Sequence, residues 1–439
     1  MKKITQLSLV AVLALASCKK DKPDTDNQTH GIALQYMDTI VKPGDDFYRF
    51  VNGKWFDKTE IPADKSTWGS FDELAKNTDL DVLNMLKEAA KNKDLKSSSD
   101  EGKAVNLYKT YLDTVSRANL GIKPIEADLA RVAAIKTIDD VNALIQATIF
   151  EGGTGLFGTY VSADALNSNK NVVYVYGTST GLGERDYYLL KDAETTEIRK
   201  KYEKHVARML KAIGNNEADA TAKAAKVLSF ETKISEAELT KVEMRDDRKT
   251  YNPMPVTKLQ SIASNINWTA YFDKTGLKNI DSVVVSQPKA LVKMNELLKT
   301  TPIEDLKAYL TWNVINGSAS MLSPELERAN WEFFSKVLSG AQKQKPIEER
   351  GVNIVNSSLG EALGKLYVDK KFPAEAKEKA QEMIENVVKA YENRIKNLPW
   401  MAPATRQGAL DKLAKLSIKI GYPDKWEDYS KLTVKSPSE

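Results

Sequence analysis

Apolar residues recur every three or four positions through much of this chain, and that spacing predicts α-helices. The clearest stripe lies in residues 376–398, with Pro373 before it and Pro399 after it, where proline is compatible with the ends of a helix. Its members are Ala380, Met383, Ile384, Val387, Val388, Tyr391, Ile395 and Leu398. Because such a stripe normally faces a core, we expect it to be buried, and we expect an aspartate at Val387 to destabilise the fold strongly.

Further amphipathic segments predict a body made mostly of helices. They occupy residues 103–115, 328–338 and 405–420. Two other segments carry helix-start signals. Asp139 and Asp140 place acidic side chains in a first turn, and Thr301 and Pro302 supply a cap and a first-turn proline. The sequence has no repeat of fixed period, which disfavours a regular solenoid.

Strand signals are few. Residues 171–176 are mostly β-branched or aromatic and are followed by Gly177. Residues 149–150 and 156–157 flank a glycine-rich turn and could pair with that strand. We therefore predict a mainly α fold: a large multi-helical lobe with a small β element.

The first residues predict an export signal. Lys2 and Lys3 precede an apolar stretch at 7–15 that is too short to span a bilayer. The small residues before Cys18, the only cysteine, resemble the bacterial lipoprotein signal, in which the cysteine is lipidated and becomes the first residue. We predict a lipoprotein signal peptide at 1–17 and lipidation at Cys18. The alternative is an ordinary secretory signal with an incidental cysteine.

A polar segment follows the predicted lipidation site. Residues 19–30 are almost free of apolar side chains, so we expect a flexible tether over 18–36. Several acyl chains on one terminus would anchor it firmly, since each buried CH₂ contributes ~0.8 kcal/mol. No other run approaches the ~18 apolar residues of a membrane-spanning helix. The predicted location is the bacterial cell envelope, as a lipid-anchored membrane protein facing the periplasm or the cell surface.

The charge balance argues against nucleic acid as a partner. The formal net charge of +4 falls to +2 once Lys2 and Lys3 are removed with the signal peptide. A nearly neutral chain has no broad cationic field for a phosphate backbone.

The chain is short of metal ligands. A zinc site takes three or four ligands, usually His or Cys, and this sequence has two His and one Cys. His30 lies in the tether, His205 lacks the following Glu and second His of a zinc helix, and Cys18 is assigned to the lipid. We predict no metal site and no catalytic residue in this chain.

Two glycine-rich segments match parts of catalytic motifs. Residues 177–181 (GTSTG) follow a predicted strand and match the outline of a hydrolase nucleophile, but neither the apolar helix nor the distant histidine of that motif follows. Residues 152–155 (GGTG) lack the Gly-Lys-Ser/Thr of a phosphate loop. We interpret both segments as turns that need backbone freedom.

Aromatic residues gather in the first part of the chain, where they would form either a ligand platform or a core. They are Phe47, Tyr48, Phe50, Trp55, Phe56 and Trp68. We favour buried core aromatics, the commoner case. The neighbouring pair Asp45 and Asp46 indicates a turn or a helix start rather than the two carboxylates of a glycosidase.

Several blocks are shared, in order, with one family of enzymes. They are 41–55 (VKPGDDFYRFVNGKW), 61–62 (IP), 68–71 (WGSF), 181–189 (GLGERDYYL), 251–254 (YNPM), 359–368 (LGEALGKLYV), 398–401 (LPWM) and 420–424 (IGYPD). Together they resemble the N-terminal region of the neprilysin-like (M13) zinc metalloendopeptidases. The similarity extends over about residues 37–430.

The resemblance implies a large, mostly helical protein with two lobes around an enclosed cavity. One lobe is zincin-like and carries H-E-x-x-H and a downstream Glu, and the other is a helical cap that restricts entry to peptides. Residues 37–430 match the N-terminal helical region, mostly the cap. The family's zinc ligands lie later, so none is carried over to any residue here, and zinc is expected only with the missing C-terminal catalytic part.

Some positions depart from the family pattern. Thr67 and Ala75 stand where some animal members read the substrate's C-terminal carboxylate with two arginines, which argues against that specificity. Gly44 stands where disulfide-bearing relatives have cysteine, consistent with a version free of disulfides. We interpret the polar residues 431–439 as a truncated C-terminal tail.

Two hypotheses about function remain. In the first, the chain is the N-terminal portion of an exported M13-type zinc metalloendopeptidase and is inactive by itself. Its partners are then peptide substrates, the missing catalytic lobe and, through the lipid anchor, a membrane. In the second, it is a complete, non-catalytic lipoprotein that binds peptides or another partner. We favour the first, because an open-sided lobe would expose the apolar surface meant for its partner lobe.

Overall fold

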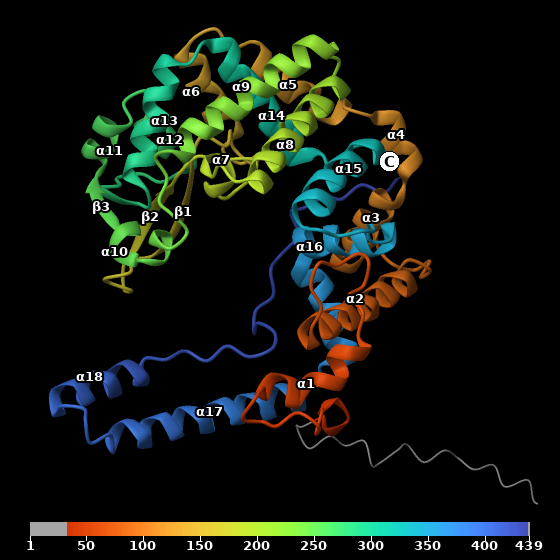
Figure 1. Ribbon diagram of the computed structural model, residues 1–439, viewed down its shortest axis with the longest axis vertical. Helices are drawn as coiled ribbons and strands as arrows, with labels where there is room; N and C mark the ends of the chain where they lie inside the picture. Colours follow the sequence, from red (N-terminus) through yellow and green to blue (C-terminus); the bar gives the residue numbers. More distant parts are fainter. Residues whose placement is uncertain (1–32, 438–439) are drawn as a thin grey trace, which may run out of the picture. The chain divides into compact units, whose positions relative to one another are not determined.

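The computed structural model describes residues 33–437, which fall into two compact units (Figure 1). The first unit ends at Pro62 and the second begins at Ala63. The predictions that concern the signal peptide, Cys18 and His30 lie outside the described residues.

The described part of the first unit, residues 33–62, contains one helix of more than a turn. Its elements are the 3-10 helix η2 (Leu34–Tyr36) and the helix α1 (Phe47–Lys58). The carboxylate of Asp46 accepts a hydrogen bond from the backbone N–H of Arg49 at 2.8 Å, which confirms the helix start predicted there. Gly53 leaves room for Asp38, because a Cβ at Gly53 would lie 2.7 Å from the Cβ of Asp38.

The second unit has three clusters of buried apolar residues, of which one joins three helices. These are α2 (Ser70–Ala89), α3 (Asp100–Leu112) and α16 (Ile347–Lys371). Leu86 of α2 and Val355 of α16 are fully buried in this cluster. A Cβ at Gly351 would lie 2.9 Å from the ring of Tyr108, so the glycine lets α3 and α16 pack closely.

The last described residues lie along α3. The Nζ of Lys103 donates to the carbonyl oxygen of Tyr429 at 2.5 Å, and the Nδ2 of Asn106 donates to that of Val434 at 3.2 Å. Tyr429 and Val434 also pack against the cluster of α2, α3 and α16. Part of the segment that we interpreted as a truncated tail therefore contributes to this cluster.

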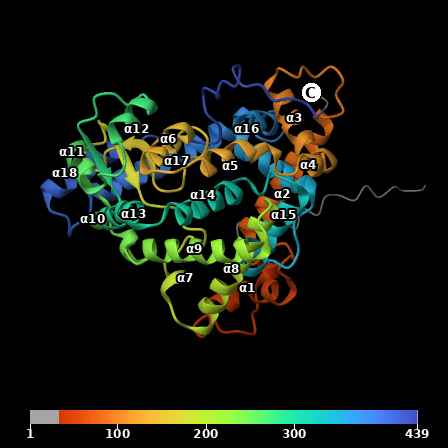
Figure 2. The same ribbon diagram turned by 90° about the horizontal axis from the view of Figure 1, so that it is seen from above.

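The second cluster is also helical. It involves η3 (Lys123–Ile125), α5 (Glu126–Ala133), α7 (Asp186–Leu189), α8 (Ala193–Ala212), α9 (Glu217–Ser235), α14 (Ile303–Ser318), α15 (Pro324–Trp331) and the π-helix η5 (Glu332–Leu338). The short helix α4 (Thr114–Leu120) precedes η3. The helix α9 lies between α8 and α14 (Figures 1 and 2). Tyr202 and Trp312 fill the centre, with their ring centroids 5.8 Å apart.

The third cluster packs helices against a four-stranded sheet. Its elements are α6 (Ile138–Thr148), β1 (Gly158–Ala163), β2 (Asn171–Tyr176), β3 (Asn252–Pro255), α11 (Val256–Ile262), α12 (Trp268–Thr275), β4 (Ser282–Val285) and α13 (Pro288–Thr300), and the short helices η4 (Glu243–Arg245) and α10 (Asp247–Thr250) precede β3. The strand order is β1-β2-β4-β3, with β2 parallel to β4 and both edge strands antiparallel to their neighbours. Val175 and Val285 are buried on the face that meets this core.

These elements confirm the predicted fold class and correct some details. The strand at 171–176 is confirmed, but its expected partners at 149–150 and 156–157 are wrong, because the strands that pair with it are 158–163 and 282–285. Gly158 permits that pairing, since a Cβ there would lie 1.9 Å from the ring of Tyr176.

The two predicted helix starts have different outcomes. Asp140 forms a capping box with Thr137 at the start of α6, as its place in a first turn indicated. At α14 the N-cap residue is Pro302 and not Thr301, because Thr301 is already the C-cap of α13.

The helix predicted at 376–398 is confirmed as α17 (Ala374–Lys396), and its main neighbour is α18 (Pro403–Ala414) (Figure 1). The prediction that its stripe is buried is wrong, because neither helix has a buried residue. The side chains of Ile384 and Val388 are half-buried, whereas Met383, Val387 and Tyr391 are 60%, 45% and 58% exposed.

This exposure overturns the expectation for an aspartate at Val387. The neighbouring helix α18 is short, because the helix expected at 405–420 ends at Ala414, and its contact leaves these side chains of α17 exposed. Within residues 33–437, Val387 therefore stays accessible to water, and a charge there would remain hydrated. None of the helices in this range is long and apolar enough to cross a membrane.

Candidate functional site

The described residues offer no metal centre. Between residues 33 and 437, no three His, Cys, Asp or Glu side chains are grouped so that they could hold a metal ion. The residues that the structure describes therefore do not fit the zinc that the resemblance implies for the family.

His205 is a core residue of α8. Its ring stacks on Phe333, with centroids 5.0 Å apart, and meets Trp312 edge-on. Burial, and to a smaller extent the charge of Arg208, lowers the pKa of His205 to about 3. The imidazole is therefore neutral near pH 7, and its buried Nε2 has no hydrogen-bond partner.

The two glycine-rich segments are turns joined by one tyrosine. The hydroxyl of Tyr309 donates to the carbonyl oxygens of Gly155 at 3.1 Å and Ser179 at 2.7 Å. Gly152 and Gly155 have positive φ angles of 98° and 80°, a conformation that favours glycine. No His lies against the exposed Ser179 among the described contacts. The arrangement supports our interpretation of both segments as turns.

The predicted aromatic core near the first helix is wrong. Phe47, Tyr48 and Phe56 of α1 are 68%, 61% and 58% exposed, so these rings do not form a buried cluster. In the second unit, Trp68 is half-buried and Lys76 lies over its ring. The positions compared with carboxylate-reading arginines, Thr67 and Ala75, are both exposed.

One carboxylate without a cationic partner lies in the core beside the segment GLGERDYYL. Glu231 of α9 is fully buried. It accepts hydrogen bonds from the backbone N–H of Gly181 at 3.0 Å and from the hydroxyls of Tyr202 at 3.0 Å and Tyr188 at 2.9 Å. The hydroxyl of Tyr188 in turn accepts from the N–H of Leu182 at 2.8 Å. We call these groups the Glu231 network.

Burial dominates the electrostatics of the Glu231 network. It raises the pKa of Glu231 to about 7, although the three donated hydrogen bonds act in the opposite direction. Gly181 is required by packing, because a Cβ there would lie 1.9 Å from the hydroxyl of Tyr202. The network therefore fixes the loop after β2 onto α8 and α9. Its groups bond one another, which is the chemistry of a structural site.

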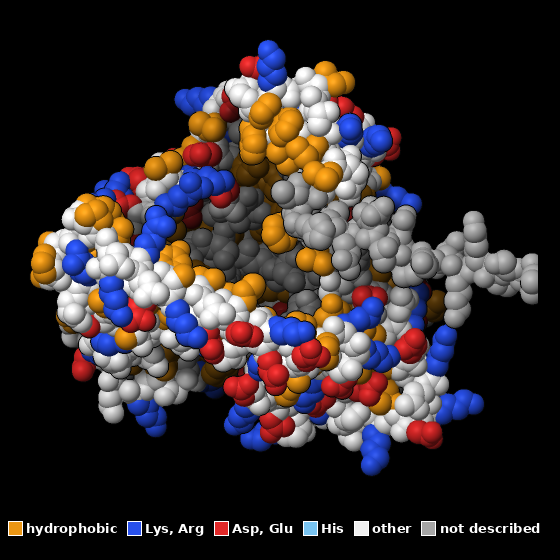
Figure 3. All heavy atoms as spheres, turned by 90° about the horizontal axis from the view of Figure 1, so that it is seen from below, with side chains coloured by type: hydrophobic (Ala, Val, Ile, Leu, Met, Phe, Trp, Pro, Cys, Tyr) orange, Lys and Arg blue, Asp and Glu red, His pale blue; other side chains and the backbone are white. Residues whose placement is uncertain are grey.

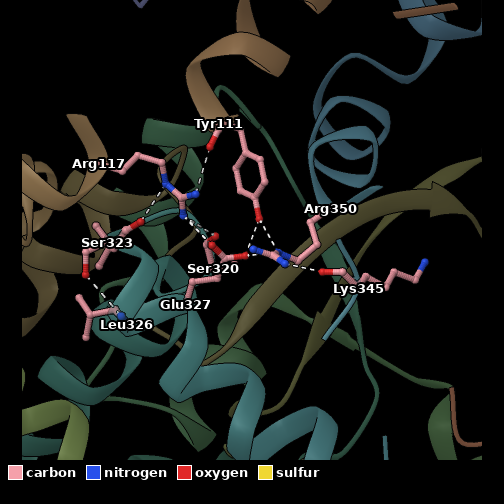
Figure 4. Close-up of polar contacts among 9 residues, drawn as sticks. Tyr111, Arg117, Ser320, Ser323, Leu326, Glu327, Lys345 and Arg350 are labelled. Carbon is pink, nitrogen blue, oxygen red and sulfur yellow. Dashed lines mark hydrogen bonds and ion pairs between the residues drawn. The ribbon is translucent and has the colours of Figure 1, made fainter. Parts of the chain in front are cut away.

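A second buried carboxylate joins four helices (Figure 4). Glu327 of α15 accepts from Nη2 of Arg117 at 3.0 Å, from Nε of Arg350 at 2.6 Å and from the hydroxyl of Tyr111 at 2.5 Å. These four side chains, here called the Glu327 cluster, come from α3, α4, α15 and α16. Glu327 and Arg117 are only 5% and 7% exposed.

The remaining donors of Arg117 are also satisfied. Its Nε donates to the carbonyl oxygen of Leu322 at 3.0 Å, and its Nη1 donates to that of Tyr111 at 3.1 Å (Figure 4). Buried charges are tolerated only when they are paired and hydrogen-bonded in this way. The Glu327 cluster therefore holds α15 against α3, α4 and α16. It links the apolar cluster that contains α15 to the one that contains α3 and α16.

A large cavity in the second unit has mixed charge. Its volume is about 840 Å³, and it lies between α8, α9 and α15. Lys211 and Arg208 on its wall are engaged with Glu217 and Glu332, while Lys200 and Lys204 are unpaired surface lysines. Exposed lysines alone do not define a ligand, so we assign no site here.

Sequence reasoning missed both buried carboxylates. The signal for Glu231 was present: it lies four residues after Val227 and three before Ile234, on the apolar face of a helix. A carboxylate inside an apolar stripe must find donors or lose its charge. Glu327 had no comparable signal.

Comparison with known proteins identifies the family. The sequence pattern of Peptidase family M13 matches residues 43–423. Neprilysin-3 of Drosophila melanogaster is 29% identical over 414 residues, and human endothelin-converting enzyme 1 is 28% identical over 403; each match covers 89% of this chain and 52% of the relative. The chain thus spans about half the length of these relatives.

A solved structure agrees with this. The Mycobacterium tuberculosis zinc metalloprotease ZMP1, crystallised with an inhibitor, superposes with a TM-score of 0.84 at 32% identity, over 92% of this chain and 61% of that one. The match in sequence and fold extends through both the Glu231 network and the Glu327 cluster. The chain therefore belongs to peptidase family M13 and corresponds to the N-terminal domain of its members.

Proposed function

We propose that this chain is the N-terminal portion of an exported M13-type zinc metalloendopeptidase, and that its helical body forms the cap that restricts access of peptides. The observation that carries this proposal is the partial coverage. About nine tenths of this chain match relatives of which it spans only 52–61%. The residues described here contain no metal-binding group, so the zinc and the base that activates water would come from the part not covered.

The geometry supports a positioning role for this portion. The Glu231 network and the Glu327 cluster are fully bonded internally, and neither presents a free acid, base or nucleophile to a substrate. They hold helices in fixed relative positions. The wall of an enclosed cavity around a substrate requires such fixed positions. Binding, exclusion of large substrates and support of the chemistry are therefore the contributions that we propose for this chain.

The alternative is a non-catalytic lipoprotein that binds peptides or another partner through the same helical body. The observation in its favour is the packing of the second unit, where three apolar clusters are already complete without a catalytic part. The nucleotide sequence after codon 439 separates the two: an in-frame continuation that encodes H-E-x-x-H supports the first proposal, and a stop codon with folded protein supports the second.

The purified 439-residue protein should hold no stoichiometric zinc and cleave no peptide, because a hydrolytic zinc needs a ligand set that the described residues lack. Metal analysis by mass spectrometry and a peptide-cleavage assay, with and without a chelator, test this. One tightly bound zinc per chain, or chelator-sensitive cleavage, would contradict the proposal.

Export on a lipid anchor is a separate part of the proposal. The variant Cys18→Ala should release the protein from the membrane fraction, because it removes the acyl chains that would hold it there. Fractionation of cells that express either form, followed by mass analysis of the N-terminal peptide, measures this. Membrane partition that is unchanged in the variant would count against the lipid anchor.

A further inference from the structure

Hydrophobic side chains on the surface of this protein gather in groups (Figure 3). One group lies on α17, where Met383, Val387 and Tyr391 are 60%, 45% and 58% exposed. We propose that these three side chains, here called the α17 face, are a docking surface for the zinc-bearing part of an M13 peptidase. This inference rests on the proposed function.

The α17 face lacks the cover that a helix of this kind needs. In proteins, most helix stability comes from packing of an amphipathic face and not from intrinsic propensity. Yet α17 is 23 residues long and has no buried residue, and its neighbour α18 has none either. The exposed apolar side chains of α17 therefore lack the apolar partner that would bury them.

The chemistry around the α17 face indicates what kind of partner fits. Lys379 pairs with Glu375 at 2.7 Å and Lys396 with Glu392 at 2.6 Å, so part of the charge along the helix is neutralised on it. A shallow hollow of about 520 Å³ lies over Met383 and Val387, and Glu382 also lines it. An apolar protein surface whose polar rim places a basic group opposite Glu382 would fill it.

The length of the relatives supplies an occupant of the right kind. Those relatives continue for the 39–48% of their length that this chain does not span. The family match itself runs to residue 423, through both α17 and α18. Helices α17 and α18, which have no buried residue, thus lie within the segment that the family pattern covers, and the uncovered part is the zinc-bearing one under the proposed function.

Two other occupants are distinguished from this one. A helix that lies on a membrane is rich in Lys and Arg, whereas α17 carries five basic and five acidic side chains. A second copy of this chain is distinguished by the concentration dependence measured below.

Methionine oxidation tests the proposal directly. Hydrogen peroxide would be applied to the 439-residue protein and to the product of the reading frame extended past codon 439, followed by peptide mass spectrometry. Because susceptibility follows exposure, Met383 should oxidise about tenfold more slowly in the longer product. Met321, which is 56% exposed, should oxidise quickly in both, and the fully buried Met294 slowly in both.

A matched pair of variants controls for folding. Val387→Asp places a charge on the α17 face, and Asn393→Asp places the same charge at an exposed position on another side of the same helix. Both should leave the melting temperature of the 439-residue protein unchanged. In the longer product, only Val387→Asp should restore fast oxidation of Met383.

The outcomes separate this inference from the proposed function. If the extended frame encodes H-E-x-x-H but Met383 oxidises equally fast in both products, the docking surface is overturned and the proposed function stands. If codon 439 is followed by a stop, both fall. Protection of Met383 by vesicles of phosphatidylethanolamine and phosphatidylglycerol, or by raising the concentration of the 439-residue protein, would assign the face to a membrane or a second copy and overturn the proposal.

Discussion

Replacing Glu327 with alanine should lower the free energy of unfolding by roughly 3–5 kcal/mol, because it leaves a buried charge without its partner. Arg117 is only 7% exposed, and Glu327 is the one carboxylate that it contacts. The hydroxyl of Tyr111 loses its acceptor at the same time, and the Nε of Arg350 keeps only the longer bond to the hydroxyl of Tyr111, at 3.2 Å. Urea unfolding of the 439-residue protein, followed by circular dichroism, measures the change.

The matched control is Glu332→Ala. Glu332 follows α15, and its partners Arg208 and Arg328 lie at distances of 2.6 and 3.0 Å, similar to those in the Glu327 cluster. Its side chain is 36% exposed, however, so water can solvate the arginines that remain. This variant should lose no more than about 1 kcal/mol. If both variants lost equal stability, the assignment of a special role to the buried cluster would be wrong.

The second large effect concerns pH. Since the pKa of Glu231 is raised from 4.5 to about 7, the folded state retains a proton that the unfolded state has lost over this range. The contribution of this group to stability is therefore complete below about pH 4.5 and is lost as the pH rises through about 7. The free energy of unfolding should fall by roughly 3 kcal/mol across this window, relative to a variant without the carboxyl.

The variant Glu231→Gln keeps the shape and removes the titration. The difference in unfolding free energy between the wild type and this variant should change with pH between about 4.5 and 7 and be constant outside that window. A difference that stays flat throughout would show that Glu231 does not titrate in the folded state there.

His205 gives a contribution of opposite sign. Its pKa is lowered from 6.5 to about 3, so its stabilising effect is complete above about pH 6.5 and is lost as the pH falls through about 3. Glu231 and His205 therefore change the free energy of unfolding with pH in opposite directions, and the two changes partly cancel in the wild type. For this reason Glu231→Gln should reveal a rise of stability with pH that the wild type conceals, and His205→Leu should reveal the fall.

Much of the fold was predictable from the sequence, and the exceptions have physical causes. Apolar spacing placed α17 to within two residues at either end, because helix periodicity is a local property. Whether its stripe is buried depends on what lies opposite, which periodicity does not record. The strand at 171–176 was recognisable from its own residues. Its pairing with β4 is a property of the fold, because Val173 lies opposite Val283, which is 110 residues further along the chain.

The buried carboxylates illustrate the same limit for the site. The hydrogen bond from Gly181 to Glu231 spans 50 residues, and the ion pair from Arg117 to Glu327 spans 210. No local pattern links residues so far apart. The block GLGERDYYL was recognisable as a family feature, but the reason for its second tyrosine, Tyr188, which donates to Glu231, required the structure.

The packing of α2 and α3 against α16 has a consequence for synthesis. Lys87 of α2 meets Glu348 of α16 across 261 residues, and Lys103 meets Tyr429 across 326. At ~5–20 residues per second, a ribosome would need roughly 10–60 s to supply those partners. During that interval the early helices would present unpaired apolar surface, which exposes the nascent chain to chaperones and proteases alike.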